Sequence, residues 1–178
     1  TEWSLAEVHL ALRQNLRGLY LGLYAAELVG MLIQEHDPHP PLFDRLAVLL
    51  SELTTPSREE AFVAFELDLL REAGYAVRLA TCCACGRPIA DRQGRYFSPS
   101  RGGAVCRDCE AATPDRQNVD PRLLGLMQMI QRLPRTAARV ERLPRLTRHQ
   151  TDPVNRLLAG HIQHVAGKRV RLGKYVLS

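Results

Sequence analysis

The sequence has little lysine, few aromatic side chains and no long apolar run. Lysine occurs only at positions 168 and 174, so arginine supplies nearly all of the positive charge, and Phe, Trp and Tyr together make up 6% of the residues. No apolar segment approaches the roughly 20 residues that cross a bilayer, and no secretory signal is visible. We therefore expect a soluble protein without membrane contact.

Motifs that mark common enzyme classes are also missing. The sequence has no Gly-x-x-x-x-Gly-Lys phosphate loop and no Gly-x-Ser-x-Gly nucleophile elbow. A zinc-dependent nucleic-acid deaminase needs a His-x-Glu ahead of a Pro-Cys-x-x-Cys, and this combination is absent too. Because no catalytic constellation is present, we predict that the protein is not an enzyme and acts by binding.

All five cysteines lie between positions 82 and 109. Cys82 and Cys85 form one pair and Cys106 and Cys109 a second; each pair encloses two residues, and 20 residues separate the pairs. This spacing is typical of structural zinc sites, because each Cys-x-x-Cys turn presents two thiolates to one side and two turns complete a tetrahedral shell. Four protein ligands leave no open position, so we predict one structural Zn²⁺ per chain.

Two alternatives to the zinc site are a disulfide pair and cysteines scattered through a core. The odd fifth cysteine and the lack of a secretory signal disfavour a disulfide framework. Cys83 is the predicted spare, because a Cys83/Cys85 pair would enclose only one residue. Cys82 is the alternative spare.

Apolar residues recur at intervals of three and four on both sides of the cysteines, which predicts amphipathic helices. The expected helices cover residues 4–17 and 18–34 (as two stretches or one kinked helix), 41–55, 56–74, 121–131 and 151–165, and Phe43 is expected to face inward. Tyr96 and Phe97 are expected in a short strand. The predicted fold is mostly α, a helical domain with an embedded small Cys₄ zinc module containing short β strands. Residues 1–80 would form one helical half, 81–112 the inserted module, and 113–178 the basic helical half completing the same domain.

Polar residues interrupt the first helical region at two places. Glu27 falls on the apolar stripe, and we interpret it as a surface or boundary carboxylate. His36 and His39, with carboxylates beside them, are candidate metal ligands. A proline-rich turn that Asp37 caps or closes is the favoured alternative.

Charge divides the chain at its cysteines. Residues 1–80 contain 6 arginines and 12 carboxylates, a net charge of −6, whereas residues 81–178 contain 18 basic residues and 7 carboxylates, a net charge of +11; together they give the +5 of the whole chain. This asymmetry predicts an acidic or polyanionic partner for the second half.

Several motifs together resemble a known family. They are Glu27, Glu35-His36-Asp37-Pro38-His39, Ala61-Phe62, Phe65-Glu66-Leu67, Leu69-Leu70, Gly74-Tyr75, the Cys82/Cys85 and Cys106/Cys109 pairs with Gly86, Tyr96-Phe97 and Gly102-Gly103. In these motifs, from about residue 15 to its end, the chain resembles RecO, a family of bacterial recombination mediators. The resemblance implies a helical C-terminal domain with a Cys₄ zinc module. No OB-like stretch precedes residue 15 and the first residue is Thr1, so we expect a fragment that lacks the family's N-terminal OB domain.

The resemblance also implies a function. RecO-like proteins bind single- and double-stranded DNA, anneal strands, join RecR and engage the C-terminal tail of single-stranded-DNA-binding protein so that RecA can load. A cytoplasmic, nucleoid-associated, SOS-independent mediator of DNA repair in bacteria is therefore the leading hypothesis. The alternative is a zinc-stabilised protein-interaction scaffold with no DNA binding of its own.

Arginines spaced three or four residues apart form the predicted DNA-binding surface, together with a basic tail. A helical segment would gather several of them on one side, although Pro134 and Pro144 interrupt it, and such a face would contact phosphates with salt-sensitive affinity. The predicted DNA-binding residues are Arg132, Arg135, Arg139, Arg142, Arg145, Arg148, Lys168, Arg169 and Arg171. A solvated surface that binds nothing in particular is the simpler alternative.

Overall fold

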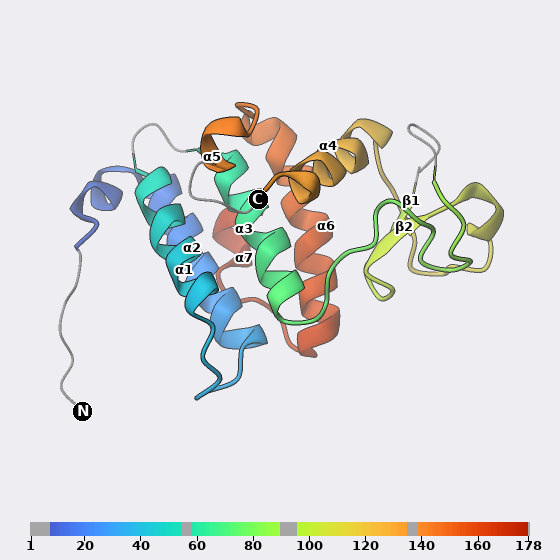
Figure 1. Ribbon diagram of the computed structural model, residues 1–178, viewed down its shortest axis with the longest axis horizontal. Helices are drawn as coiled ribbons and strands as arrows, with labels where there is room; N and C mark the ends of the chain where they lie inside the picture. Colours follow the sequence, from blue (N-terminus) through green and yellow to red (C-terminus); the bar gives the residue numbers. More distant parts are fainter. Residues whose placement is uncertain (1–7, 55–57, 90–95, 135–138, 178) are drawn as a thin grey trace.

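Helices make up most of this structure, a computed structural model that describes residues 8–54, 58–89, 96–134 and 139–177, with the side chains at 139 and 140 excepted. In chain order its elements are the 3₁₀ helix η1 (Leu10–Gln14), α1 (Leu16–Leu32), α2 (Pro40–Glu52), α3 (Glu59–Glu72), β1 (Tyr96–Ser98), β2 (Gly103–Val105), the 3₁₀ helix η2 (Arg107–Cys109), β3 (Gln117–Asn118), α4 (Pro121–Arg132), α5 (Arg139–Arg142), α6 (Arg148–Ala166) and α7 (Gly173–Val176). The strands lie apart from the helices, at one end of the long axis (Figure 1).

Helix α3 runs through the middle of the helical part. Every residue from 59 to 70 is buried, because α1, α2, α4 and α6 all pack against this helix. Figure 1 shows α3 between the α1–α2 pair and α6. Phe62, Leu69 and Leu70 are fully buried along it, so burial of apolar surface is the main source of stability here.

Four buried carboxylates also lie on α3, those of Glu59, Glu60, Glu66 and Asp68. Arginines from neighbouring segments neutralise three of them, in the pairs Arg17–Glu59 at 2.9 Å, Arg58–Glu60 at 3.0 Å and Arg45–Asp68. Within the described part of the chain, neither carboxylate oxygen of Glu66 has a hydrogen-bond partner. Complete burial raises the pKa of Glu66 well above its usual value.

The three short strands form an antiparallel sheet with the order β2-β1-β3. Tyr96 pairs with Val105 on one side and with Asn118 on the other. Gly102 ends the turn between β1 and β2 with a φ of +59°, a conformation that favours glycine. The backbone following α3 joins the sheet: Arg78 N donates to Gly102 O at 2.9 Å, and Ala104 N donates to Arg78 O at 2.8 Å.

The predicted mostly helical fold, with a small strand-containing cysteine module, is confirmed. The predicted start of the last long helix at Thr151 is wrong, because α6 begins at Arg148. Thr147 and Gln150 form a reciprocal capping box there, which satisfies the first N–H groups. Pro153 consequently lies inside the helix instead of opening it.

One further expectation about the helices needs correction. Phe43 faces outward, with 70% of its surface exposed. The basic tail continues into α7, which packs on α1, where the rings of Tyr20 and Tyr175 stack with centroids 4.8 Å apart.

Glu27 is half-buried, as expected of a boundary residue, and its carboxylate accepts hydrogen bonds from the backbone N–H groups of Arg171 and Leu172 at 2.7 and 2.9 Å. None of the described helices combines the length and apolarity that crossing a membrane requires.

Candidate metal centre and basic cleft

Four cysteines meet at the far end of the strand region. The sulfur atoms of Cys82, Cys85, Cys106 and Cys109 all lie within 4.8 Å of one another. The sequence separates the two pairs by 20 residues, and the β1–β2 hairpin closes that distance. The described residues contain no other cluster of this kind, so His36 and His39 are not brought together with further ligands.

Each cysteine pair is shaped by a tight backbone turn. In the first turn Cys82 N donates to Arg87 O at 2.8 Å and Gly86 N donates to Cys82 O at 2.9 Å, while Gly86 takes a φ of +75°. In the second, the N–H of Cys109 donates to Cys106 O at 3.1 Å within η2. Arg87 and Asp108 connect the two turns through a 2.7 Å ion pair.

Three thiols of the cluster differ in their tendency to ionise. Burial opposes ionisation of Cys82, but backbone N–H groups, that of Cys106 foremost, outweigh it and hold its pKa below the usual value. A hydrogen bond from the Arg87 side chain lowers the pKa of Cys85 to about 6. The hydrogen bond with Cys106 is the main reason that the pKa of Cys109 is raised to about 12. Adjacent thiolates repel one another, and a bound cation removes this conflict; the cluster is therefore suited to hold a metal ion.

The fifth cysteine lies outside the cluster. Cys83 is buried, and its Sγ donates to the carbonyl oxygen of Gly103 at 3.6 Å. Burial raises the pKa of this thiol, which disfavours the thiolate that a metal needs. The structure thus places Cys83 as a packing residue of the module.

The arginines between α4 and α6 occupy three separate elements instead of one helical face. Arg132 ends α4, Arg142 ends α5 and Arg148 begins α6, all three exposed. Arg145 and Arg148 each contact a buried carboxylate, at 3.6 Å from Glu60 and 3.1 Å from Asp152. Arg135 and the side chain of Arg139 lie outside the described residues.

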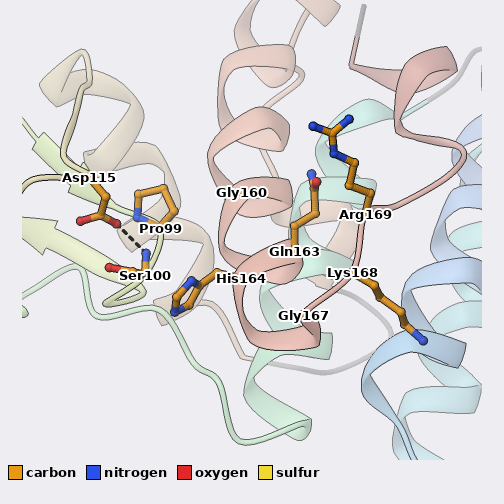
Figure 2. A pocket seen from close by; sticks show the side chains of 9 residues that line it. All are labelled: Pro99, Ser100, Asp115, Gly160, Gln163, His164, Gly167, Lys168 and Arg169. Atoms are coloured by element: carbon orange, nitrogen blue, oxygen red, sulfur yellow. Dashed lines mark hydrogen bonds between the residues drawn. The ribbon is translucent and has the colours of Figure 1, made fainter.

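The cations after α6 are placed differently. Lys168, Arg169 and Arg171 are exposed, and within the described ranges no carboxylate pairs with their side chains. Lys168 and Arg169 line a cleft of about 440 Å³ between α6 and the strand module. Figure 2 shows Pro99, Ser100 and Asp115 on the module side, and Gly160, Gln163 and His164 on the α6 side.

Asp115 is the one carboxylate that lines this cleft. Its oxygens accept hydrogen bonds from the Ser98 hydroxyl at 2.8 and 2.9 Å and from the backbone N–H of Ser100 at 2.8 Å (Figure 2 draws the latter). Partial burial opposes ionisation, but the hydrogen bond from Ser100 N and those from the serine hydroxyls lower its pKa. Asp115 thus fixes the β1–β2 turn, and its lone pairs are engaged within the module.

Comparison with known proteins places this architecture in a family. The model of the family described as "Recombination protein O C terminal" matches residues 13–172, most of the chain. The chain belongs to the RecO family. This membership agrees with the resemblance in the cysteine and glycine motifs of the sequence.

Individual RecO relatives cover different shares of the chain. The DNA repair protein RecO of Anaeromyxobacter dehalogenans (strain 2CP-C) is 42% identical over 105 residues, which are 58% of this chain and 41% of the relative. That of Anaeromyxobacter sp. (strain Fw109-5) is 30% identical over 175 residues, 97% of this chain and 67% of the relative. That of Syntrophotalea carbinolica is 34% identical over 127 residues, 71% of this chain and 46% of the relative. The chain thus spans only about two fifths to two thirds of the RecO proteins that it matches.

Two residues of this RecO chain belong to no sequence motif: the first holds a turn within the module, and the second joins the module to α6. They are Asp115, described above, and His161, whose ring is buried between α6 and the β1–β2 turn. Asp115 follows Pro114 in what looks like an ordinary surface turn. His161 lies next to Ile162 on the apolar face of α6, and a histidine on such a face is the signal that could have identified it.

Proposed function

We propose that this chain is a non-enzymatic DNA-repair and recombination mediator domain, which binds DNA and partner proteins. Membership of the RecO family supports the general role. The single structural observation that carries DNA binding is the group of unpaired cations at the end of α6, beside the cleft. Because these side chains pair with no carboxylate among the described residues, they are free to contact phosphates.

We also propose that Cys82, Cys85, Cys106 and Cys109 hold one structural Zn²⁺. Tetrahedral zinc with metal–sulfur bonds of about 2.3 Å requires sulfur–sulfur separations of about 3.8 Å. The Sγ atoms of Cys85 and Cys106 are 3.8 Å apart, so this edge already has the required length. Four thiolates would complete the zinc shell, and the metal would hold the module together without activating water.

Within the DNA-binding proposal, the individual arginines are not equivalent. Arg145 and Arg148 contact buried carboxylates, so their primary role is to stabilise the helices. Lys168, Arg169 and Arg171, with Arg132 and Arg142, are the stronger candidates for contacts to single- and double-stranded DNA, since all five are exposed. Such contacts would serve strand annealing with little base recognition.

The partner proteins in this proposal are RecR and the C-terminal tail of single-stranded-DNA-binding protein, whose joint action would promote RecA loading. A basic rim beside the cleft suits an acidic peptide, because arginine and lysine bind carboxylates as well as phosphates. The site of action would be the bacterial cytoplasm, at the nucleoid.

DNA binding is tested by reversing charge at the cleft. The double variant K168E/R169E should bind a fluorescent single-stranded oligonucleotide more weakly than the unchanged protein. The slope of log affinity against log salt should fall by about 1.4, because each lost phosphate contact on single strands contributes about 0.7. Fluorescence anisotropy over a range of salt concentrations measures both quantities.

A matched control is the double variant R13E/R71E, which changes the net charge equally at exposed positions of the acidic half. Its affinity should fall less, since long-range attraction is screened by salt. Equal losses in the two double variants would contradict a local phosphate site. No oligonucleotide binding by the unchanged chain, together with retention on immobilised RecR, would instead support the protein-interaction scaffold.

A further inference from the structure

His161 of α6 connects the cysteine module to the helical part through both of its ring nitrogens. Nδ1 lies 2.7 Å from the carbonyl oxygen of Pro99, in the β1–β2 turn. Nε2 lies 3.1 Å from the carbonyl oxygen of Tyr75, just after α3. The residue is only 5% exposed, so water does not readily replace either contact.

Both partners of the ring are acceptors. A carbonyl oxygen accepts hydrogen bonds but cannot donate one, and a neutral imidazole has a single N–H. In either neutral tautomer, one ring nitrogen would turn its lone pair toward a carbonyl oxygen at 2.7 or 3.1 Å. The imidazolium form, with two N–H donors, satisfies both contacts.

We propose that His161 is a proton-dependent clasp, which docks the cysteine module on the helical part in its imidazolium form and releases it when the ring loses its proton. Histidine is the side chain whose charge changes near neutral pH. Two charge-assisted hydrogen bonds offset the cost of burying the charge. This inference stands on the geometry around the ring and does not depend on DNA binding.

The packing around the ring supports a fixed position for it. A β-carbon at Gly102 would lie 2.4 Å from Cε1 and 2.6 Å from Nε2 of His161, so only glycine leaves room for the imidazole here. A β-carbon at Gly160, the preceding residue of α6, would lie 3.5 Å from Pro99. The clasp therefore closes where α6 and the turn already touch, and it sets the distance between the two walls of the cleft.

No charged or titratable group that the structure describes on the surrounding elements takes the place of a proton on the His161 ring in its two hydrogen bonds. These groups are His164 on α6, Tyr75 and Arg78 on the segment after α3, and Arg101 and Asp115 on the module. Among the described residues the ring's hydrogen bonds are those to Pro99 and Tyr75. The Asp115 carboxylate is engaged by Ser98 and Ser100, and Arg78 donates to Cys83 O at 3.2 Å.

The direct test observes the ring nitrogens by ¹⁵N NMR in the zinc-loaded protein across the neutral pH range. Both nitrogens of His161 should carry a proton at pH 6, whereas the ring protons of exposed His164 should exchange freely with solvent. As the pH rises and His161 loses its proton, amide hydrogen exchange in the β1–β2 turn should accelerate. A singly protonated His161 at pH 6, with the turn still protected from exchange, would overturn the proposal.

A second test compares thermal unfolding of the unchanged protein with H161Q, and uses H164Q as the matched control on the same helix. Glutamine can reach only one of the two carbonyls with its NH₂ group. H161Q should unfold about 4 °C lower at pH 6, and this difference should shrink as the pH rises, because the unchanged protein then loses the same hydrogen bond.

The cysteine thiols can also change protonation with pH. They are the same in every variant, so their effect on Tm cancels when a variant is compared with the unchanged protein. H164Q should stay within about 1 °C of the unchanged protein at each pH. A Tm difference for H161Q that is constant with pH would show that the residue only fills space, and would contradict the clasp.

Discussion

The helical part and the cysteine module of this chain are stabilised by different means. In the helical part, α3 is buried along residues 59–70, and its apolar side chains contact four other helices. In the module, Phe97 and Ala104 belong to this same buried core, a small separate cluster consists of Cys82, Cys83 and Val105, and the strands are two or three residues long. Two- and three-residue strands with so little apolar surface are not stable on their own in water.

This difference explains why the sequence predicts the two parts from different features: the module from its cysteine spacing, and the helical part from the periodicity of its apolar residues. The helices need only the right pattern of apolar residues, since burial supplies their free energy. The module needs a specific set of atoms instead: the four converging thiols, the Asp115 carboxylate and two carbonyl groups facing His161. We therefore expect changes to one part to leave the other largely folded.

The largest expected effect comes from removal of the metal ligands. In the double variant C106S/C109S, bound zinc should fall from one ion per chain to none. The module should unfold, because binding energies of about 10–16 kcal/mol stabilise structural zinc sites in small domains. Elemental analysis measures the metal, and hydrogen exchange should show protection lost in β1 and β2 but kept in α3.

C83S is the matched control for this prediction, since Cys83 is a buried cysteine of the same module that lies outside the cluster. It should retain a full zinc content. Zinc loss from C83S, or zinc retained by C106S/C109S, would show that the ligand set is different. Unfolding of α3 together with the module would contradict the separation of the two parts.

The next effect should appear in the helical part alone. Arg17 binds Glu59 and Asp152 at 2.9 Å each and donates to Val176 O at 2.7 Å. In R17A both carboxylates lose a buried partner, which costs about 3–5 kcal/mol. Urea denaturation should measure this loss in the free energy of unfolding, with zinc content unchanged.

R13A, at an exposed position of η1, is the control, and its free energy of unfolding should stay within about 0.5 kcal/mol of that of the unchanged protein. An equal loss in both variants would refute the role of the buried network.

Sequence patterns predicted the parts of the molecule that depend on local rules. Intervals of three and four residues located α2, α3 and α4, and the stretch 18–34 located α1, to within a few residues, because helical periodicity is local. Of the stretch 4–17, residues 4–7 lie outside the described residues, and the part before α1 contains the 3₁₀ helix η1 instead of an α-helix. The cysteine spacing singled out the four residues whose sulfur atoms meet. The sequence misplaces the start of α6 because Thr151-Asp152-Pro153 resembles a helix start, whereas the capping box of Thr147 and Gln150 is the stronger signal.

The missed features depend on contacts between distant segments. Nothing near Arg145 in the chain reveals that it meets the buried carboxylate of Glu60. His161 meets carbonyl groups 62 and 86 residues away in the chain, and only the docking of the module on α6 brings these together. Phe43 directly follows Leu42 in α2, and neighbouring helical residues point about 100° apart, so the helix that buries Leu42 exposes Phe43.

The smallest expected effect concerns Glu66, a buried acid of the helical core that lacks a hydrogen-bond partner among the described residues. Burial raises its pKa, so the folded state favours the protonated acid, whereas glutamate in an unfolded chain ionises above about pH 4.3. The stability that the neutral acid retains below that pH is therefore lost as the pH rises through the folded-state pKa.

Glutamine has nearly the same shape and no ionisable proton, so E66Q should match the unchanged protein within about 1 kcal/mol near pH 4 and be more stable by about 1–3 kcal/mol at pH 8. Urea denaturation at several pH values measures the difference, and E35Q, at an exposed position, should show none. Parallel pH profiles for E66Q and the unchanged protein would mean that Glu66 is ionised in the folded chain and has a cationic partner. The helical part would then depend on specific polar contacts as much as the module does, and the two parts would differ less in how they are stabilised.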